Sequence, residues 1–186
     1  MNVMVISTSP NKDGLTAACT AAAVDGLKQA GVQAEQAWLN EMQVGACQAC
    51  ENGWGTCRTE HECQILDGFQ ALHARVRQAD GLILVTPVSW GEMSESSKSF
   101  TDRLRRCEAS LAGESRLANK PVIAVAAAGG SGNGMITCLL SMERWIQHVR
   151  ARTFDLIPVN RWSRDYKLAA IRSAAAACAA ELLARA

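Results

Sequence analysis

The segment from Cys47 to Cys63, CQACENGWGTCRTEHEC, holds half of the chain's eight cysteines: Cys47, Cys50, Cys57 and Cys63. Their spacing, C-x2-C-x6-C-x5-C, supplies the four thiolates of a [4Fe–4S] cluster if the loop brings them together. Structural zinc sites usually contain two tight cysteine pairs, whereas this segment has one tight and one loose pair, so zinc fits less well. A redox disulfide is also less favoured. Four reduced thiols packed in a long surface loop stay level with the cluster as an alternative.

A polar stretch near the N-terminus, Ser7–Thr16 (STSPNKDGLT), offers a second set of chemically useful groups. Its hydroxyl and amide side chains would stand beside free backbone N–H groups at a helix start, which is a favourable place for a phosphate. These side chains belong to Ser7, Thr8, Ser9, Asn11 and Thr16. The stretch matches neither the Walker loop nor the G-x-G-x-x-G dinucleotide fingerprint. The alternative is an ordinary turn, rich in serine and threonine, that caps the helix.

Two later loops contain groups suited to a flat ligand. In Thr86–Ser94 (TPVSWGEMS), Trp90 could stack on a planar ring, or it could pack under the next helix. In Ala127–Met135 (AAGGSGNGM), four glycines would let the backbone lie against a ligand, or they could simply form a flexible turn. Taken alone, each loop favours the second alternative, and only their convergence favours a ligand site.

Short apolar runs alternate with amphipathic stretches along the whole chain, which indicates right-handed βαβ units around a parallel sheet. We predict an α/β fold, a doubly wound three-layer sandwich with a five-stranded parallel sheet, formed by one domain over residues 1–186. The expected strands are Val3–Ser7, Val32–Leu39, Gly81–Pro87, Lys120–Gly129 and Thr153–Val159. The expected helices are Leu15–Gly31, Leu66–Val76, Ser94–Leu111, Met135–Val149 and Lys167–Ala186.

The cysteines fall in a segment, residues 40–64, that has no clear period and is too long for a routine connection, so it is an insertion with a candidate function. The three polar or glycine-rich loops instead follow the carboxyl ends of strands. In a doubly wound sheet these ends meet at one edge, where ligands bind. We therefore expect the three loops to converge on one ligand site.

Helical periodicity also predicts which individual residues are buried and which are exposed. Leu66, Phe69, Leu72 and Val76 should share one apolar face. The charged residues of the helix after Ser94 should cover its solvated outer side; these are Lys98, Asp102, Arg103, Arg105 and Arg106. The cysteines outside the loop should be buried and pack as small hydrophobic residues; these are Cys19, Cys107, Cys138 and Cys178. Met42 and Val44 should pin the start of the cysteine loop.

Composition excludes several classes of function. The 186 residues are 48% hydrophobic and 20% charged, with a net charge of +1, which is typical of a globular protein. This balance gives no electrostatic footprint for nucleic acid or for an anionic membrane. No apolar run approaches the ~18 residues of a membrane span, and the N-terminus does not resemble a signal peptide. We therefore expect a cytoplasmic protein, where stable disulfides are rare.

The stretch from Thr86 to Arg103 resembles a motif of the NAD(P)H-dependent FMN reductase branch of the flavodoxin-like superfamily. That motif is T-P-x-Y-[WFY]-G-x-[ML]-S followed by K-x-F-x-D-R. This chain matches it with Thr86, Pro87, Trp90, Gly91, Met93, Ser94, Lys98, Phe100, Asp102 and Arg103, and has Ser89 at the tyrosine position. The resemblance covers nearly the whole chain. The CQAC pair and the later CQILDGF also resemble the iron–sulfur flavoproteins of this group.

The resemblance implies FMN as cofactor, with its phosphate and its isoalloxazine ring held by the three loops. The implied phosphate site is Ser7, Ser9, Asn11, Gly14, Leu15 and Thr16. The implied ring site is Pro87, Val88, Ser89, Trp90, Gly91, Glu92, Met93, Ala128, Gly129, Gly130 and Gly134. NAD(P)H would supply hydride, and a quinone, free flavin or other small-molecule acceptor would receive the electrons. No catalytic side chain is implied, and the protein is expected to be a homodimer or homotetramer.

Two other functions stay open at this point. The first is an iron–sulfur flavoprotein that carries electrons, with a [4Fe–4S] cluster on Cys47, Cys50, Cys57 and Cys63. The second is a flavodoxin-like binding protein without flavin. It is suggested by Ser89, where relatives usually have an aromatic residue, and by Asn11, where relatives often have arginine.

Overall fold

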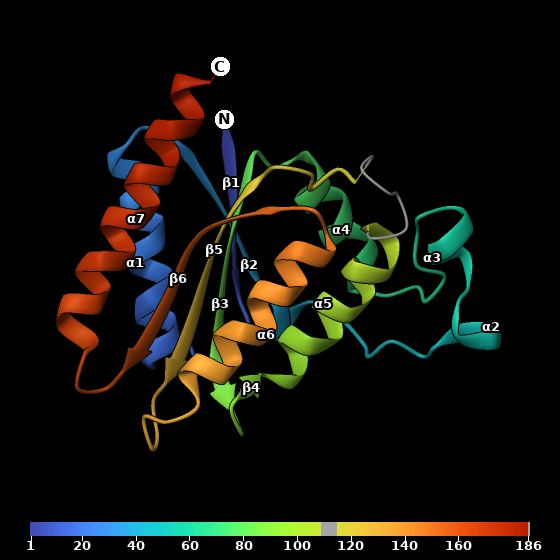
Figure 1. Cartoon of the computed structure of the whole chain (residues 1–186), viewed down its shortest axis with the longest axis horizontal. Helices are drawn as coiled ribbons and strands as arrows, with labels where there is room; N and C mark the ends of the chain where they lie inside the picture. Colours follow the sequence, from blue (N-terminus) through green and yellow to red (C-terminus); the bar gives the residue numbers. More distant parts are fainter. Residues whose placement is uncertain (109–114, 186) are drawn as a thin grey trace.

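The computed structural model describes residues 1–108 and 115–185 and has a parallel sheet at its centre (Figure 1). Its strand order is β2-β1-β3-β5-β6, with the short β4 paired antiparallel to β3. This is the flavodoxin order, so the predicted doubly wound α/β fold with five parallel strands is confirmed. The strands are β1 (Asn2–Ser7), β2 (Gln33–Trp38), β3 (Gly81–Ser89), β4 (Glu92–Met93), β5 (Pro121–Ala128) and β6 (Arg152–Asn160).

Helices cover both faces of the sheet and make two separate cores (Figure 1). Along β1, Val3 and Val5 pack under the helices of one face, while Met4 and Ile6 pack under those of the other. This alternation divides the buried residues between the layers, as a strand period of two requires. The first face carries α1 (Leu15–Gln29) and α7 (Arg164–Ala184), and the second carries α4 (Gly68–Gln78), α5 (Glu95–Glu108) and α6 (Met135–His148).

The four cysteines outside the loop are buried, as predicted. Burial raises the pKa of the Cys19, Cys107 and Cys138 thiols to about 12 and that of Cys178 to about 11. A thiol that stays protonated at neutral pH is a poor nucleophile and a poor metal ligand. These four residues therefore pack as small hydrophobic side chains, and the redox-capable cysteines are those of the loop.

Some predicted boundaries were wrong. Leu66 is 88% exposed, because Asp67 and Gln70 form a capping box that starts α4 at Gly68, two residues after Leu66. The last helix begins at Arg164, before the predicted Lys167. The predicted Leu111 and the terminal Ala186 lie outside the described residues. Among residues 1–108 and 115–185, no helix combines the length and apolarity needed to span a membrane.

The cysteine segment projects from the outer side of α5, at the opposite end of the molecule from α1 and α7 (Figure 1). It contains the 3-10 turn η1 (Leu39–Glu41) and two single turns, α2 (Cys50–Gly53) and α3 (Thr56–Thr59). Met42 and Val44 pack against the core, as predicted. The segment is thus an ordered addition to the sheet rather than a part of it.

Candidate functional site

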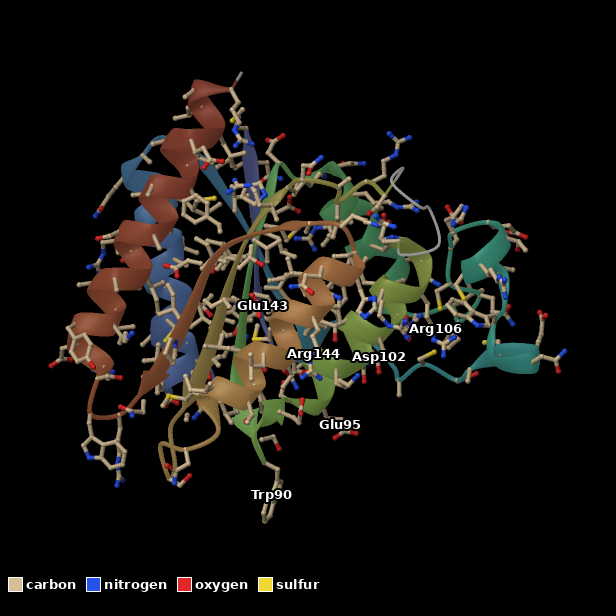
Figure 2. All side chains as sticks on the ribbon, viewed as in Figure 1. Trp90, Glu95, Asp102, Arg106, Glu143 and Arg144 are labelled. Carbon is tan, nitrogen blue, oxygen red and sulfur yellow. The ribbon has the colours of Figure 1, made fainter. Side chains whose placement is uncertain are left out.

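The second predicted loop is a β-hairpin that presents a tryptophan. Strand β3 continues to Ser89, pairs with β4, and turns through Trp90 and Gly91, whose φ angles are 52° and 79°. Two central residues with positive φ define a type I′ turn, in which tryptophan is an unusual residue. Trp90 is fully exposed and points away from the edge of the sheet (Figure 2). It does not pack under a helix and is free to meet a ligand or another molecule.

Hydroxyl groups hold the first loop against this hairpin. Ser94, which follows β4, donates from Oγ to the Thr8 carbonyl oxygen at 3.1 Å. The Ser94 backbone N–H donates to Thr86 Oγ1, also at 3.1 Å. Thr8 is completely buried in this contact, and its own hydroxyl donates to the Val85 carbonyl oxygen at 3.3 Å, so it is structural. The first two loops converge as the topology predicted.

Close contact between glycines joins the third loop to the hairpin. A Cβ on Gly134 would lie 2.7 Å from the Gly91 Cα, so neither position has room for a side chain. Thr137 Oγ1 donates to the Gly91 carbonyl oxygen at 2.8 Å and strengthens the junction. Gly129 and Gly130, in contrast, face open space. Gly134 therefore packs against the hairpin, whereas Gly129 and Gly130 leave open space directly after β5.

An open hollow of about 640 Å³ lies between the hairpin and the third loop. It is lined by Val88, Ser89, Trp90, Gly91, Ser131, Asn133, Gly134 and Thr137. The side chains of Met93 and Ala128 are buried in the core, so these two predicted site residues could contact a ligand only through their backbones. Pro87 is half-buried and Glu92 is exposed beside them.

The start of α1 has the donor set that an anion needs. Ser7 is completely buried, and its hydroxyl has no hydrogen-bond partner among the described residues. Gly14 precedes the helix in an extended conformation, no side chain caps it, and the first turn has no acidic residue. A buried hydroxyl without a partner normally costs stability, so its presence at the end of β1, in the connection that leads to an uncapped helix start, fits a bound phosphate.

The other predicted phosphate residues surround this point, although not all offer side chains. Ser9 and Thr16 are buried, and Ser9 Oγ accepts from the Asn11 backbone N–H at 3.1 Å. Asn11 is exposed, and its Oδ1 accepts from the Asp13 backbone N–H. The Leu15 side chain packs against the core, which leaves only its backbone for a ligand. The residues present therefore fit the phosphate of FMN.

All four loop cysteines line one small cavity of about 10 Å³, together with Arg103 and Arg106. Cys57 and Cys63 also pack against the core, so they form the inner wall of the cavity. In the described parts of the chain, no three ligating side chains stand close enough to hold a metal ion. The four thiols of the loop thus line one cavity, together with two guanidinium groups. Their sulfur atoms are not close enough to one another to form a metal site.

Arg103 contradicts the prediction of a solvated helix face. Its side chain is completely buried, and its Nε–H donates to Cys63 Sγ at 3.3 Å. Burial alone would lower the pKa of this guanidinium, but its hydrogen bonds with Asp67 and Cys63 raise the pKa instead. This burial could not be predicted, because helical periodicity assigned the charged residue to the exposed side. Of the other charged residues of α5 named above, Lys98 is exposed, and Asp102, Arg105 and Arg106 are partly buried.

The backbone of the cysteine loop is strained. Seven non-glycine residues of the described chain have positive φ, and four of them are here: Gln43, Ala49, Glu51 and His61. Each such conformation costs an L-residue on the order of 1 kcal/mol. Strain of this kind persists only where the surroundings enforce it, and it concentrates at functional sites.

Comparison with known protein families shows to which family the chain belongs. A family model described as NADPH-dependent FMN reductase matches residues 1–158. The chain belongs to this family. Membership places it among flavin-dependent oxidoreductases, in agreement with the donor set at the start of α1.

Two curated relatives of this FMN reductase family member are iron–sulfur flavoproteins. The protein from Methanosarcina thermophila is 28% identical over 149 residues, which are 78% of this chain and 73% of that protein. The protein from Methanocaldococcus jannaschii is 31% identical over 134 residues, which are 72% of this chain and 65% of that protein. The similarity therefore includes most of this chain but only part of each relative.

Solved structures confirm that the family member has a flavodoxin-like fold. An NAD(P)H:quinone oxidoreductase from Methanothermobacter marburgensis matches with a TM-score of 0.70 at 17% identity, covering 95% of this chain and 94% of its own. A flavodoxin from the domain Archaea matches with a TM-score of 0.65 at 11% identity, covering 98% and 99%. At these identities the likeness shows the fold alone.

Proposed function

We propose that the protein binds FMN where the three loops meet and uses NAD(P)H to reduce a small-molecule acceptor such as a quinone or free flavin. The observation that carries this proposal is the buried Ser7 hydroxyl, which has no partner among the described residues and stands at the end of β1, in the connection that leads to the uncapped start of α1. Bound FMN would supply the chemistry, accepting hydride from the nicotinamide and releasing electrons to the acceptor.

The residues of this chain would bind and orient the cofactor rather than react. Ser7, Ser9, Asn11 and Thr16, with the backbone of Gly14 and Leu15, would hold the phosphate. The segments 87–93 and 128–130, together with Gly134, would border the ring. Trp90 stands at the hairpin tip, where its indole could cover a planar group that enters the hollow. No side-chain acid, base or nucleophile is needed for this role.

The first test is the absorption spectrum of protein purified without oxygen, followed by addition of NADPH and then a quinone. We expect flavin bands that bleach with NADPH and return with the quinone. A colourless protein that takes up no added FMN would overturn the proposal. If the bands bleach only with a chemical reductant, the protein binds flavin but NADPH is not its electron donor.

A second candidate function is electron transfer through an iron–sulfur cluster. It is favoured by the cavity that Cys47, Cys50, Cys57 and Cys63 share, because four thiols are the donor set that a [4Fe–4S] cluster takes. Arg103 and Arg106 line the same cavity, and their charges would offset the negative charge of four thiolates. The residues therefore fit the cluster in kind, and the loop would have to draw the sulfurs closer to bind it.

The cluster is tested by iron and sulfide analysis after anaerobic reconstitution. We expect iron and sulfide in the native protein and their loss in Cys50→Ser. Cys178→Ala, a buried cysteine on α7, is the matched control and should retain both. A native protein with neither iron nor sulfide would leave the four cysteines as reduced thiols.

The predicted homodimer or homotetramer also stays a proposal. Ile136 and Leu140 are 61% and 45% exposed on α6, which begins directly after Gly134 at the hollow. A second copy could cover these apolar side chains close to the flavin site. Light scattering of the native protein and of Ile136→Glu would test this, with dissociation expected in the variant.

A further inference from the structure

Arg103 is the most completely buried basic residue in the described parts of the chain. It lies in the middle of α5 and is 1% exposed. A buried guanidinium is strongly unfavourable unless every charge and donor finds a partner. A solvated arginine would contribute equally well to solubility, so solubility does not explain why Arg103 is buried. The identity of its partners shows what the burial achieves.

These partners lie on both sides of the cysteine segment. Nη1 donates to the Gly45 carbonyl oxygen at 3.1 Å, just before Cys47. Nη2 donates to the Ile65 carbonyl oxygen at 2.8 Å, just after Cys63. One rigid guanidinium therefore ties together the two ends of the loop that carries all four cysteines.

An acidic residue and an aromatic ring complete the environment of Arg103. Nη1 also donates to Asp67 Oδ2 at 2.6 Å, and the guanidinium lies 4.3 Å from the centre of the Phe69 ring. Asp67 Oδ2 accepts from the Gly45 backbone N–H at 2.9 Å as well. The carboxylate thus joins the same closure, and its charge compensates that of the arginine.

The remaining donor, Nε–H, reaches Cys63 Sγ at 3.3 Å. We propose that Arg103 is the positioning residue of the cysteine site: it closes the loop, orients Cys63 toward the cavity, and raises the reduction potential of a cluster bound there. This inference depends on the cluster proposed above as the second candidate function. It concerns a residue that contacts a ligand atom but does not itself react.

The direction of the potential shift follows from charge. Each electron added to a cluster increases its negative charge, and most of that charge is shared with the cysteine sulfurs. A cationic N–H donor at one sulfur stabilises the reduced state more than the oxidised state, so the potential rises. Arg103 supplies such a donor inside the protein, where water does not screen it.

Two substitutions separate closure of the loop from the effect on potential. Arg103→Lys keeps the charge but loses the planar fork, so it cannot contact the loop ends and the sulfur together. Asp67→Asn weakens the closure and leaves the Nε–H donor on Cys63. Both variants should hold less iron per chain after anaerobic reconstitution than the native protein. The midpoint potential, followed by absorbance during a redox titration, should fall in Arg103→Lys. It should not fall in Asp67→Asn, which keeps the Nε–H donor and removes a negative charge beside Arg103.

The outcomes distinguish the two proposals. A native protein that takes up no iron and sulfide would overturn the cluster, and this inference with it. A native protein that loads normally while Arg103→Lys keeps its occupancy and potential would overturn the role of Arg103 alone.

A second measurement needs no variant, should Arg103→Lys fail to fold. In native protein labelled with ¹⁵N-arginine, electron–nuclear double resonance on the reduced cluster should detect coupling to a guanidinium nitrogen. Absence of that coupling would refute the N–H···S contact.

Discussion

The Ser7 hydroxyl gives the sharpest test of the flavin site, because the substitution Ser7→Ala should change stability and affinity in opposite directions. Ser7 closes β1, is completely buried, and its Oγ has no partner among the described residues. A buried polar group without a partner costs about 1–3 kcal/mol. Its removal should therefore stabilise the flavin-free protein by about 1 kcal/mol, which raises Tm by about 2–4 °C for a chain of this size.

The effect on FMN should be the reverse. If Ser7 donates to the phosphate, the contact is a hydrogen bond to a charged group, worth about 1.5–3 kcal/mol. At 1.4 kcal/mol for each factor of ten, its loss should weaken FMN binding by about 10- to 150-fold. A purely structural serine would show the first effect without the second.

The assay combines thermal unfolding of flavin-free protein with a fluorescence titration of FMN. Ser97→Ala is the matched control, because Ser97 on α5 is also fully buried with an unpartnered hydroxyl but lies outside the proposed phosphate site. We expect a similar gain in Tm for the control and unchanged FMN affinity. If Ser7→Ala binds FMN as tightly as the native protein, the phosphate does not contact Ser7.

Three further predictions concern the hairpin, the glycine contact and a buried carboxylate. Trp90→Asn should raise the free energy of unfolding in urea by about 1 kcal/mol, because asparagine adopts a positive φ more easily than tryptophan. The same substitution should weaken FMN binding, and unchanged affinity would exclude contact between Trp90 and the ring. Gly134→Ala should lower that free energy by about 1–3 kcal/mol, because its Cβ would meet the Gly91 Cα at 2.7 Å; a neutral result would refute the close contact. Hydrogen bonds from His73, Arg77 and Ser115 outweigh burial and lower the pKa of Glu108 from 4.5 to about 2. The stabilisation that ionised Glu108 provides is therefore present above pH 4.5 and is lost as pH falls toward 2. Glu108→Gln should lower the free energy of unfolding by about 3 kcal/mol at pH 7 and flatten its decrease in acid, as measured by urea unfolding. Parallel pH curves for the native protein and the variant would contradict this.

Local patterns were sufficient to predict the sheet, its helices and the edge where the loops meet. The buried strands β3 and β5 are continuous apolar runs, and such runs are visible in the sequence without knowledge of their partners. Once the strands alternate with helices, the handedness of the connections leaves few topologies. The convergence of Thr8, Ser94 and Gly134 on one edge followed from that topology.

Features set by distant partners could not be predicted in the same way. Arg103 contacts residues 36 to 58 positions earlier in the chain, so nothing near it in sequence distinguishes it from the exposed charges of α5. The turn at Trp90 and Gly91 was missed for a different reason, since tryptophan is rarely found with positive φ. The signal for Leu66 was present in the Asp67–Gln70 capping pair, which marks the start of α4.

The position of Cys47 bears on whether the two candidate functions exclude each other. Cys47 lines the cysteine cavity and also a groove that it shares with Ser89 and Met93 of the hairpin. Glu95 and Asp102 line the same groove, and Figure 2 shows them along α5 between Trp90 and Arg106. A cluster on the loop and a flavin at the hairpin would therefore be neighbours along one surface of α5. Since this arrangement would let electrons pass between them, NAD(P)H oxidation at the flavin and electron delivery at the cysteine loop are compatible as two steps of one activity.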